Sequence, residues 1–191
     1  ETDHRKIWQT FGDHFYLYAG TPTGAWLTHE FSVVFGIKEK LTSQTAMDIY
    51  DQIQDKLKTP DFLPRAMYER FNIEALTTTD AATDLLEEHK KIKASGWKQR
   101  IIPCFRPDAV VNILADAWKS HIDALSDVCG FEVNSFARFI QAIENRREYF
   151  RIMGAVSTDQ GLFSPYTQEI SAADADAIFQ RALKGQATEE D

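Results

Sequence analysis

Side chains that could do chemistry gather in three polar clusters, each following a short β-prone stretch. The clusters are residues 77–80, 105–108 and 157–161. At the carboxyl ends of parallel strands the loops converge, and helix amino termini point their N–H groups at ligands. We therefore expect Asp80, Arg106 and Asp159 to share one rim of a sheet and to point into a common cleft.

Arg106 is the first candidate for ligand binding. A planar guanidinium can bind a carboxylate through two parallel hydrogen bonds, and Pro107 keeps the residue before it out of helical geometry. The alternative is that Arg106 pairs with Asp80 or Asp108 and only holds loops together. The pattern selects an edge of the sheet and does not by itself select a reaction.

The three aspartates differ in how easily a structural role explains them. Asp80 and Asp108 each precede a predicted helix, so either can be an N-cap. After Asp159 the next predicted helix begins only near Ser171, and a loop of roughly ten residues exceeds the usual length of about 2–6. This favours a site role for Asp159.

Other catalytic and metal-binding motifs are missing from the sequence. The five histidines are scattered, without a His-x-His or His-Glu-x-x-His pattern. Cys104 and Cys129 lack a metal-binding or redox spacing, so we expect two reduced thiols and a cytoplasmic protein. There is no glycine-rich phosphate loop and no nucleophile elbow.

Residues 3–70 have the apolar periodicity of helices throughout. We expect a first helix over 3–19, a break at 20–24, and a second helix ended by Gly36 in a left-handed conformation. A third helix is capped by Thr42 and stopped by Pro60, and a short one follows over 62–71. Aromatic residues at core spacing are predicted to be buried: Trp8, Phe11, Phe15, Trp26 and Phe35.

From residue 71 onward, predicted strands alternate with predicted helices. The strands are 72–78, 100–105 and 155–157; the helices are 83–95, 108–129, 135–153 and a last one capped by Ser171 and ending near Gly185. Alternation predicts parallel strands with right-handed crossovers. Pro103 is unusual inside a central strand.

Three strands cannot close an eight-stranded barrel, which takes roughly 250 residues. We therefore predict an α/β fold consisting of an all-helical domain at 3–70, part of a (β/α)8 TIM-type barrel at 71–185, and a frayed tail at 186–191.

Composition limits the partners. Hydrophobic residues make up 43% and charged residues 26%, as in ordinary globular proteins. The net charge of −8 disfavours nucleic acid, and no apolar run approaches the ~20 residues that span a bilayer. Residues 1–10 are polar and do not resemble a signal peptide. We expect neither nucleic acid nor a membrane as a partner.

Taken together, the clusters resemble segments of uronate isomerases. Residues 77–89 are similar to that family's "TTD…D-x-L-x-x-H" segment, 105–108 match "F-R-P-D", and 154–161 resemble "G-x-x-S-D-H-G". Upstream, residues 20–37 are similar to "G-N-P…W…F-G-I". These four ordered matches cover nearly the whole chain.

The resemblance implies a member of the amidohydrolase superfamily with a distorted eight-stranded barrel and a helical insertion. Its reaction interconverts D-glucuronate with D-fructuronate, and D-galacturonate with D-tagaturonate. This is an aldose–ketose isomerisation through an enediolate. A divalent metal, commonly zinc, would orient substrate oxygens and stabilise negative charge.

The resemblance also assigns roles to individual residues. Arg106 matches the arginine that contacts the sugar acid, and Asp159 matches a strand-end aspartate near the site. On this basis we predict that Arg106 and Asp80 bind the substrate and that Asp159 is catalytic. Gln160 stands where many members have a titratable His. The family's metal ligands, a His-x-His and a late aspartate, have no counterpart here, so we expect them outside this chain.

We therefore expect an internal part of a uronate isomerase that is inactive alone. Its expected partners are a sugar acid and either a second copy or the remainder of the same protein. Two alternatives stay open. One is a non-catalytic sugar-acid-binding module that keeps Arg106, and the other is an interaction domain with unpaired sheet edges.

Overall fold

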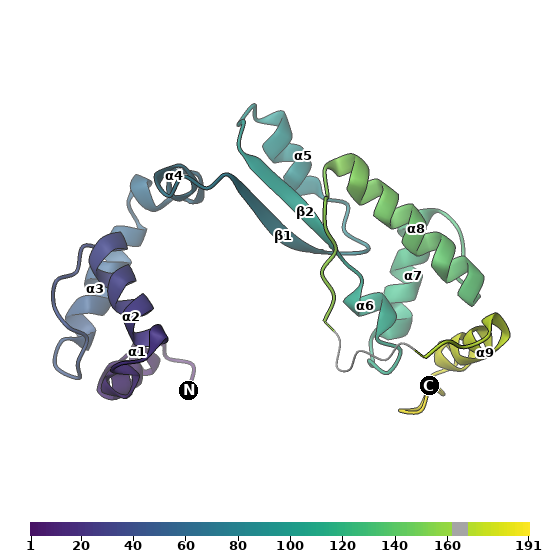
Figure 1. Cartoon of the computed structure of the whole chain (residues 1–191), viewed down its shortest axis with the longest axis horizontal. Coiled ribbons are helices and arrows are strands. Elements are labelled where there is room, and N and C mark those ends of the chain that lie inside the picture. Colours follow the sequence, from purple (N-terminus) through teal and green to yellow (C-terminus); the bar gives the residue numbers. More distant parts are fainter. Residues whose placement is uncertain (162–167) are drawn as a thin grey trace. The chain divides into compact units, whose positions relative to one another are not determined.

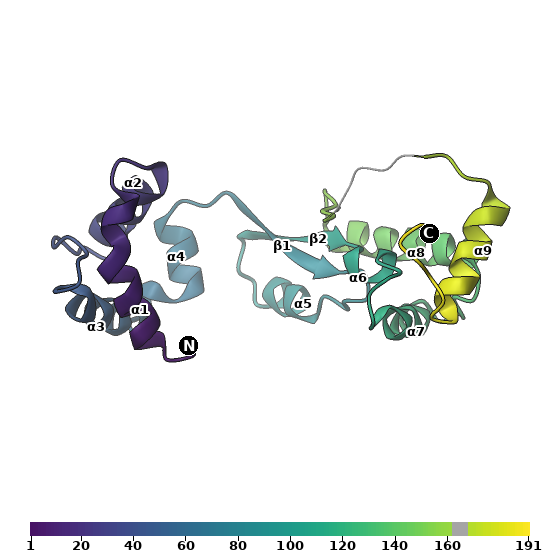
Figure 2. The ribbon, with the colours of Figure 1, turned by 90° about the horizontal axis from the view of Figure 1, so that it is seen from below.

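The computed structural model describes residues 1–161 and 168–191. It divides the chain into two compact units, Glu1–Ile73 and Glu74–Asp191, which are coloured from purple to blue and from teal to yellow (Figures 1 and 2). Each unit has a buried apolar cluster of its own.

The first unit is helical. Its elements are α1 (His4–His14), the 3₁₀ helix η1 (Phe15–Tyr18), α2 (Pro22–His29), the π-helix η2 (Glu30–Val34), α3 (Ala46–Leu57), the 3₁₀ helix η3 (Pro60–Phe62) and α4 (Pro64–Arg70). Gly36 ends the second helical stretch with φ +63°, as predicted. The helical reading of this region is therefore confirmed, although several boundaries differ.

Threonine side chains form hydrogen bonds just before two helices of the first unit. The Thr21 hydroxyl accepts a hydrogen bond from the Gly24 N–H at 3.1 Å, so α2 begins inside the stretch that we expected to be a break. The third helix begins at Ala46 and is not capped by Thr42. Instead, the Thr42 and Thr45 side chains bond to each other and close the preceding turn.

Aromatic side chains surround the core of the first unit. Trp8 packs against the buried residues and donates its indole N–H to the Ala46 carbonyl at 2.7 Å. The prediction that Trp26 is buried was wrong, because its side chain is 63% exposed. Trp26 lies in α2, whereas the buried Phe31 lies in the π-helix η2 that follows it.

The second unit contains two parallel strands and five helices within its described residues. They are β1 (Ala75–Ala81), α5 (Glu87–Ala94), β2 (Arg100–Arg106), α6 (Asp108–Val111), α7 (Trp118–Cys129), α8 (Phe136–Met153) and α9 (Ala172–Leu183). The register runs from Ala75 opposite Arg100 to Ala81 opposite Arg106. The α/β class with parallel strands is confirmed.

The third predicted strand is reduced to a single bridge. Thr158 bridges Phe105 in parallel, with hydrogen bonds from Phe105 N–H to the Ser157 carbonyl (3.4 Å) and from Asp159 N–H to the Phe105 carbonyl (3.1 Å). Backbone N–H groups alternate between the two edges of a strand, so the nitrogen of Pro103 lies on the same edge of β2 as that of Phe105. Few backbone hydrogen bonds form along that edge, so the N–H that proline lacks is not needed there. Proline is therefore tolerated in β2.

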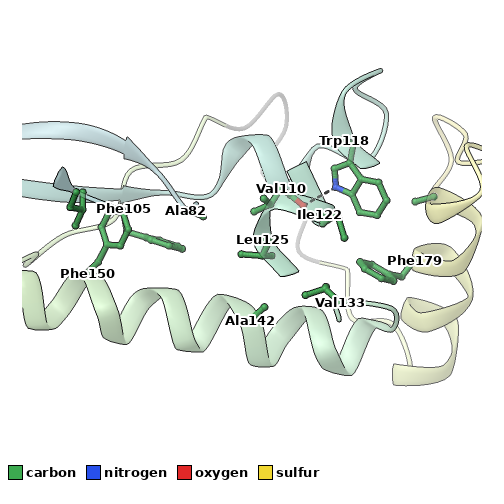
Figure 3. Close-up of a cluster of buried hydrophobic side chains, with 12 residues drawn as sticks. Ala82, Phe105, Val110, Trp118, Ile122, Leu125, Val133, Ala142, Phe150 and Phe179 are labelled. Carbon is green, nitrogen blue, oxygen red and sulfur yellow. Dashed lines mark hydrogen bonds between the residues drawn. The ribbon is translucent and has the colours of Figure 1, made fainter. Parts of the chain in front are cut away.

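Two helices of the second unit are shorter than expected. Leu86 adopts a left-handed conformation (φ +54°) and donates its N–H to Asp84 Oδ1 at 2.6 Å, which delays α5 until Glu87. The helix expected over 108–129 is interrupted between α6 and α7. The Trp118 indole bridges this interruption by donating to the Val110 carbonyl at 2.8 Å (Figure 3).

The core of the second unit lies between β2 and the helices. The Phe105 ring meets Phe150 of α8 edge-on at 5.1 Å between centroids, and Trp118 meets Phe179 of α9 at 5.4 Å (Figure 3). Ser171 caps α9 as predicted, and Ser135, which was predicted only as the start of a helix, caps α8. Both cysteines are free thiols.

The end of the chain is bonded back to α9, whereas we expected residues 186–191 to be frayed. The Gln186 N–H donates to the Arg181 carbonyl at 2.9 Å, and the Asp191 carboxylate pairs with the Arg181 side chain and accepts from Thr188. A capped turn replaces the expected loose end because Asp191 supplies an acceptor for several donors at once. None of the helices formed by the described residues is long and apolar enough to cross a membrane.

Candidate functional site

Arg106 occupies the last position of β2 and contacts two carboxylates. Its Nε donates to Asp108 Oδ2 at 3.1 Å, and its Nη1 lies 3.7 Å from Asp159 Oδ2. The side chains of Arg106, Asp108 and Asp159 are 41%, 32% and 51% exposed, respectively. The structure thus brings Arg106 and Asp159 together at the carboxyl end of β2.

Asp108 connects the two loops that meet at this site. It is the first residue of α6 but not its N-cap, which is Pro107. One carboxylate oxygen accepts from Arg106, and the other accepts from the Gly161 N–H at 2.8 Å. Sequence reasoning considered Asp108 only as a cap or a loop partner, although an aspartate two positions after a strand-end arginine was a usable signal.

The electrostatics of Asp108 follow from these contacts. Burial acts to raise the pKa of its carboxyl group, but the Gly161 N–H and the Arg106 guanidinium outweigh burial, and the net pKa is lowered. Asp108 is therefore charged at neutral pH and holds one edge of the guanidinium. The Arg106 Nη groups make no hydrogen bond within residues 1–161 and 168–191 and face Asp159.

Asp80 does not join this group. It lies inside β1, one residue before the end of the strand, and not beyond it as expected. Its Oδ2 accepts from the Thr78 hydroxyl at 2.7 Å and from the Cys104 N–H at 3.3 Å. Asp80 therefore ties β1 to β2 and is not an N-cap.

The strand register explains why Asp80 and Arg106 are separated. Paired residues of a parallel sheet direct their side chains to the same face, and neighbours along a strand alternate. Asp80 pairs with Phe105, which packs on α8, whereas Arg106 pairs with Ala81. Asp80 consequently shares the helix-covered face, while Arg106 points to the opposite one.

His89 of α5 extends the Asp80 network on that covered face. Its Nε2 lies 2.9 Å from the Thr78 hydroxyl oxygen. The Thr78 proton is used in the bond to Asp80, so His89 must donate to Thr78. His89 therefore helps to attach α5 to β1 and lies away from the Arg106 face.

A metal centre does not fit the described residues. No three or more His, Cys, Asp or Glu side chains within 1–161 and 168–191 are placed to hold an ion. The carboxylates of Asp108 and Asp159 lie beside a guanidinium, which opposes a cation there.

The whole of this arrangement lies within one known family. The family model described as glucuronate isomerase matches residues 1–191. The chain belongs to the glucuronate isomerase family. A uronate isomerase from Nostoc punctiforme is 52% identical over 185 residues, and one from Brucella canis is 45% identical over 191 residues.

Solved structures of glucuronate isomerases share the same fold. The glucuronate isomerase from Caulobacter crescentus superposes with a TM-score of 0.90 at 39% identity, and the alignment covers 100% of this chain and 40% of that one. The uronate isomerase from Thermotoga maritima superposes with a TM-score of 0.86 at 26% identity. That alignment covers 97% of this chain and 41% of the Thermotoga protein. The alignment with the Nostoc protein covers 97% of this chain and 39% of that protein. The alignment with the Brucella protein covers 100% of this chain and 41% of that protein. The chain therefore spans about two fifths of the length of these relatives.

Proposed function

We propose that this chain is part of a uronate isomerase that interconverts D-glucuronate with D-fructuronate and D-galacturonate with D-tagaturonate. Membership of the glucuronate isomerase family and the names of the relatives support this assignment. The observation that carries the proposal within this chain is the Arg106 guanidinium. It is anchored at one nitrogen and available at the other two.

Arg106 is proposed to bind the sugar carboxylate. Asp108 occupies Nε, so the guanidinium is oriented before a ligand arrives. The two Nη groups can then form the parallel hydrogen bonds that a carboxylate prefers. The 3.7 Å contact with the half-exposed Asp159 is weak enough for an incoming anion to replace it.

Asp159 is proposed to be catalytic. Its backbone N–H is bonded to the Phe105 carbonyl, which places its carboxylate at the same strand end as Arg106. A charged carboxylate there can accept a proton during isomerisation, when a proton moves between C2 and C1 of the sugar. Gln160 beside it cannot serve as a titrating group.

For Asp80, direct substrate contact stays a prediction, and its geometry favours a supporting role. Its carboxylate is bonded to Thr78 and to the Cys104 N–H, which fixes the spacing of β1 and β2. The Asp80→Asn variant separates the two roles. Substrate contact predicts weaker glucuronate binding in a fully stable variant, whereas a supporting role predicts lower stability.

The remaining parts of the proposal concern the whole protein. We propose that β1, β2 and the bridge at Thr158 belong to one (β/α)8 barrel. We further propose that a divalent metal, zinc in many such enzymes, is held by ligands outside this chain, and that the partner of this chain is the remainder of the protein. The protein is proposed to act in the cytoplasm, consistent with its two free thiols.

Titration of the 191-residue chain with glucuronate tests the carboxylate site. We expect glucuronate to bind more tightly than glucose, which has the same ring without the carboxylate. Arg106→Met should weaken glucuronate binding at least about tenfold, because a charged hydrogen-bonded pair is lost. The glucuronate affinity of Arg106→Lys should lie between those of the wild type and Arg106→Met, because lysine keeps the charge but cannot form two parallel hydrogen bonds.

A matched control for this titration is Arg5→Met in the first unit, which removes an exposed arginine–aspartate pair from α1. It should leave glucuronate affinity unchanged. Equal affinities of the wild type and Arg106→Met would contradict the carboxylate site.

A turnover assay addresses the isolated chain. We propose that it does not isomerise glucuronate even with added zinc, because the metal ligands lie elsewhere. Formation of fructuronate by the purified chain, above the background of an Asp159→Asn variant, would disprove this part of the proposal.

An interaction role is favoured by one separate observation. A groove of about 700 Å³ runs between α8 and residues 155–158, beside a segment that pairs with β2 through one bridge. An open sheet edge of this kind can accept another strand. Sedimentation analysis tests whether this edge binds a second copy of the chain, because a monodisperse monomer at high concentration would argue against self-association.

A further inference from the structure

Arg146 of α8 is the buried charged residue of the described chain, with 3% of its surface exposed. Its Nε donates to the Ala82 carbonyl and its Nη2 to the Asp84 carbonyl, both at 2.8 Å. The guanidinium also lies 4.2 Å from the centroid of the Tyr149 ring. Both carbonyls belong to the loop that connects β1 to α5.

None of the ion pairs formed by the described residues includes Arg146. Burial accordingly lowers the pKa of its guanidinium. Burying an unpaired cation is costly, and peptide carbonyls with a ring face compensate only in part. Leucine or methionine could fill the same space but would leave the Ala82 and Asp84 carbonyls without these donors, so the guanidinium holds the loop in a way that apolar packing cannot.

Ala82 connects Arg146 to the candidate site. The Ala82 N–H donates to the Arg106 carbonyl at 3.1 Å, and the Ala82 carbonyl accepts from Arg146. A single residue thus separates the buried guanidinium from the strand end that bears Arg106. Displacement of the loop at Ala82 would be transmitted to Arg106 through this one hydrogen bond.

Tyr149 adds a second contact from α8 to the same loop. Its hydroxyl donates to the Leu85 carbonyl at 2.5 Å. The next residue, Leu86, is left-handed and almost fully buried, and its N–H is held by Asp84. The loop therefore has a strained conformation that external contacts must maintain.

We propose that Arg146 is a positioning residue for carboxylate binding. Arg146 fixes the β1–α5 loop and, through the hydrogen bond of Ala82, the end of β2 at Arg106. Tyr149 supports it by holding the same loop. This inference rests on the proposed function of Arg106. It adds that the affinity for a sugar acid depends on a buried cation that does not touch the ligand.

Hydrogen exchange of the 191-residue chain tests the first step. In Arg146→Met, the Ala82 amide should lose at least about tenfold of its protection, while the Leu125 amide of α7 should change by less than about twofold at the same pH. Tyr149→Phe should cause a smaller loss at Ala82, because both Arg146 bonds remain. A purely structural role would lower the protection of both amides together.

Titration with glucuronate tests the second step, at a temperature where each variant is folded. Arg146→Met should weaken binding about tenfold, and Arg146→Lys should recover part of it because lysine can reach one carbonyl. Phe179→Leu is the matched control. It removes core volume at the contacts with Trp118 and Phe139, and it should leave affinity unchanged despite lower stability.

The outcomes are distinguishable. Unchanged Ala82 protection in a folded Arg146→Met chain overturns the inference, as does lost protection with unchanged glucuronate affinity. If the wild type binds no glucuronate, the proposed function fails, and the exchange data alone decide whether Arg146 holds the loop. If Arg146→Met does not fold, Arg146→Lys and Tyr149→Phe provide the same comparisons.

Discussion

At the level of single residues, the two carboxylates beside Arg106 have different roles. Asp108 makes two hydrogen bonds, one to the guanidinium and one to the Gly161 N–H. Asp159 makes one long and exposed contact with Nη1. An incoming anion can therefore displace Asp159 while Asp108 keeps the guanidinium in place.

Asp108→Asn should lower the free energy of unfolding by about 1 kcal/mol at pH 7. The folded-state pKa of Asp108 lies below its ordinary value of 3.8. Its charge therefore contributes stability above that value, and the contribution is lost as the pH falls through the folded pKa. Urea denaturation at pH 7 and pH 3 should show the difference between wild type and variant shrinking in acid. A constant difference would contradict the role of the charge.

Gly161→Ala should weaken glucuronate binding several-fold. A Cβ atom at this position would lie 2.8 Å from Asp108 Oδ1 and 3.5 Å from Arg106 Nη2. The Asp108 carboxylate would have to move and would release the Gly161 N–H. Calorimetric titration measures the affinity. Gly20→Ala in the first unit is a control for lost stability alone, because alanine is strained at φ +74° but its Cβ meets no atom within 4 Å.

Among the elements, α8 contacts the loop after β1 and ends just before the segment that carries Asp159. It supplies Arg146 and Tyr149 to the β1–α5 loop, and it ends at Gly154, which has φ +108°. That backbone conformation turns the chain into the segment that bridges β2 at Thr158. The direction taken after Gly154 thereby decides where Asp159 lies.

Gly154→Ala should destabilise the second unit by about 1–2 kcal/mol, because an L-residue is strained at positive φ. It should also reduce the protection of the Phe105 amide, which is bonded to Ser157. Ser135→Ala is the control at the other end of α8. Ser135→Ala should lower the free energy of unfolding by about 1 kcal/mol, since it removes only the N-cap. It should not selectively reduce the exchange protection of the Phe105 amide. Equal protection of Phe105 in both variants would contradict the role of Gly154.

At the scale of the whole molecule, stability arises in two separate apolar cores. Ile49 belongs to the core of the first unit and Leu125 to that of the second, and both are 0% exposed. Neither core shares a residue with the other. Each unit therefore buries its own apolar surface.

Ile49→Ala and Leu125→Ala should each lower the free energy of unfolding by about 2–5 kcal/mol. The losses should add in the double variant to within about 0.5 kcal/mol, because the two sites share no partners. Denaturation monitored separately in each unit, by exchange of amides near the two sites, provides the measurement. A large deviation from additivity would show that the cores are coupled.

Local patterns were sufficient for much of this protein. The cap at Ser171, the left-handed Gly36 and the parallel α/β order all depend on residues close in sequence. Four ordered motif matches, of which the one around Arg106 is a single member, were also sufficient to predict the family. These features are decided by backbone propensities and by the period of apolar residues, which a sequence displays directly.

Tertiary structure alone decided which of the predicted site residues meet. β1 ends at Ala81, three residues later than predicted, so Asp80 lies inside the strand and pairs with Phe105. Side chains alternate along a strand with a period of two, which places Asp80 on the face opposite Arg106. The bridge by Asp108, the reduction of the third strand and the link from Arg146 through Ala82 depend on contacts between residues distant in sequence. Such contacts are set by register and packing, which no local pattern encodes.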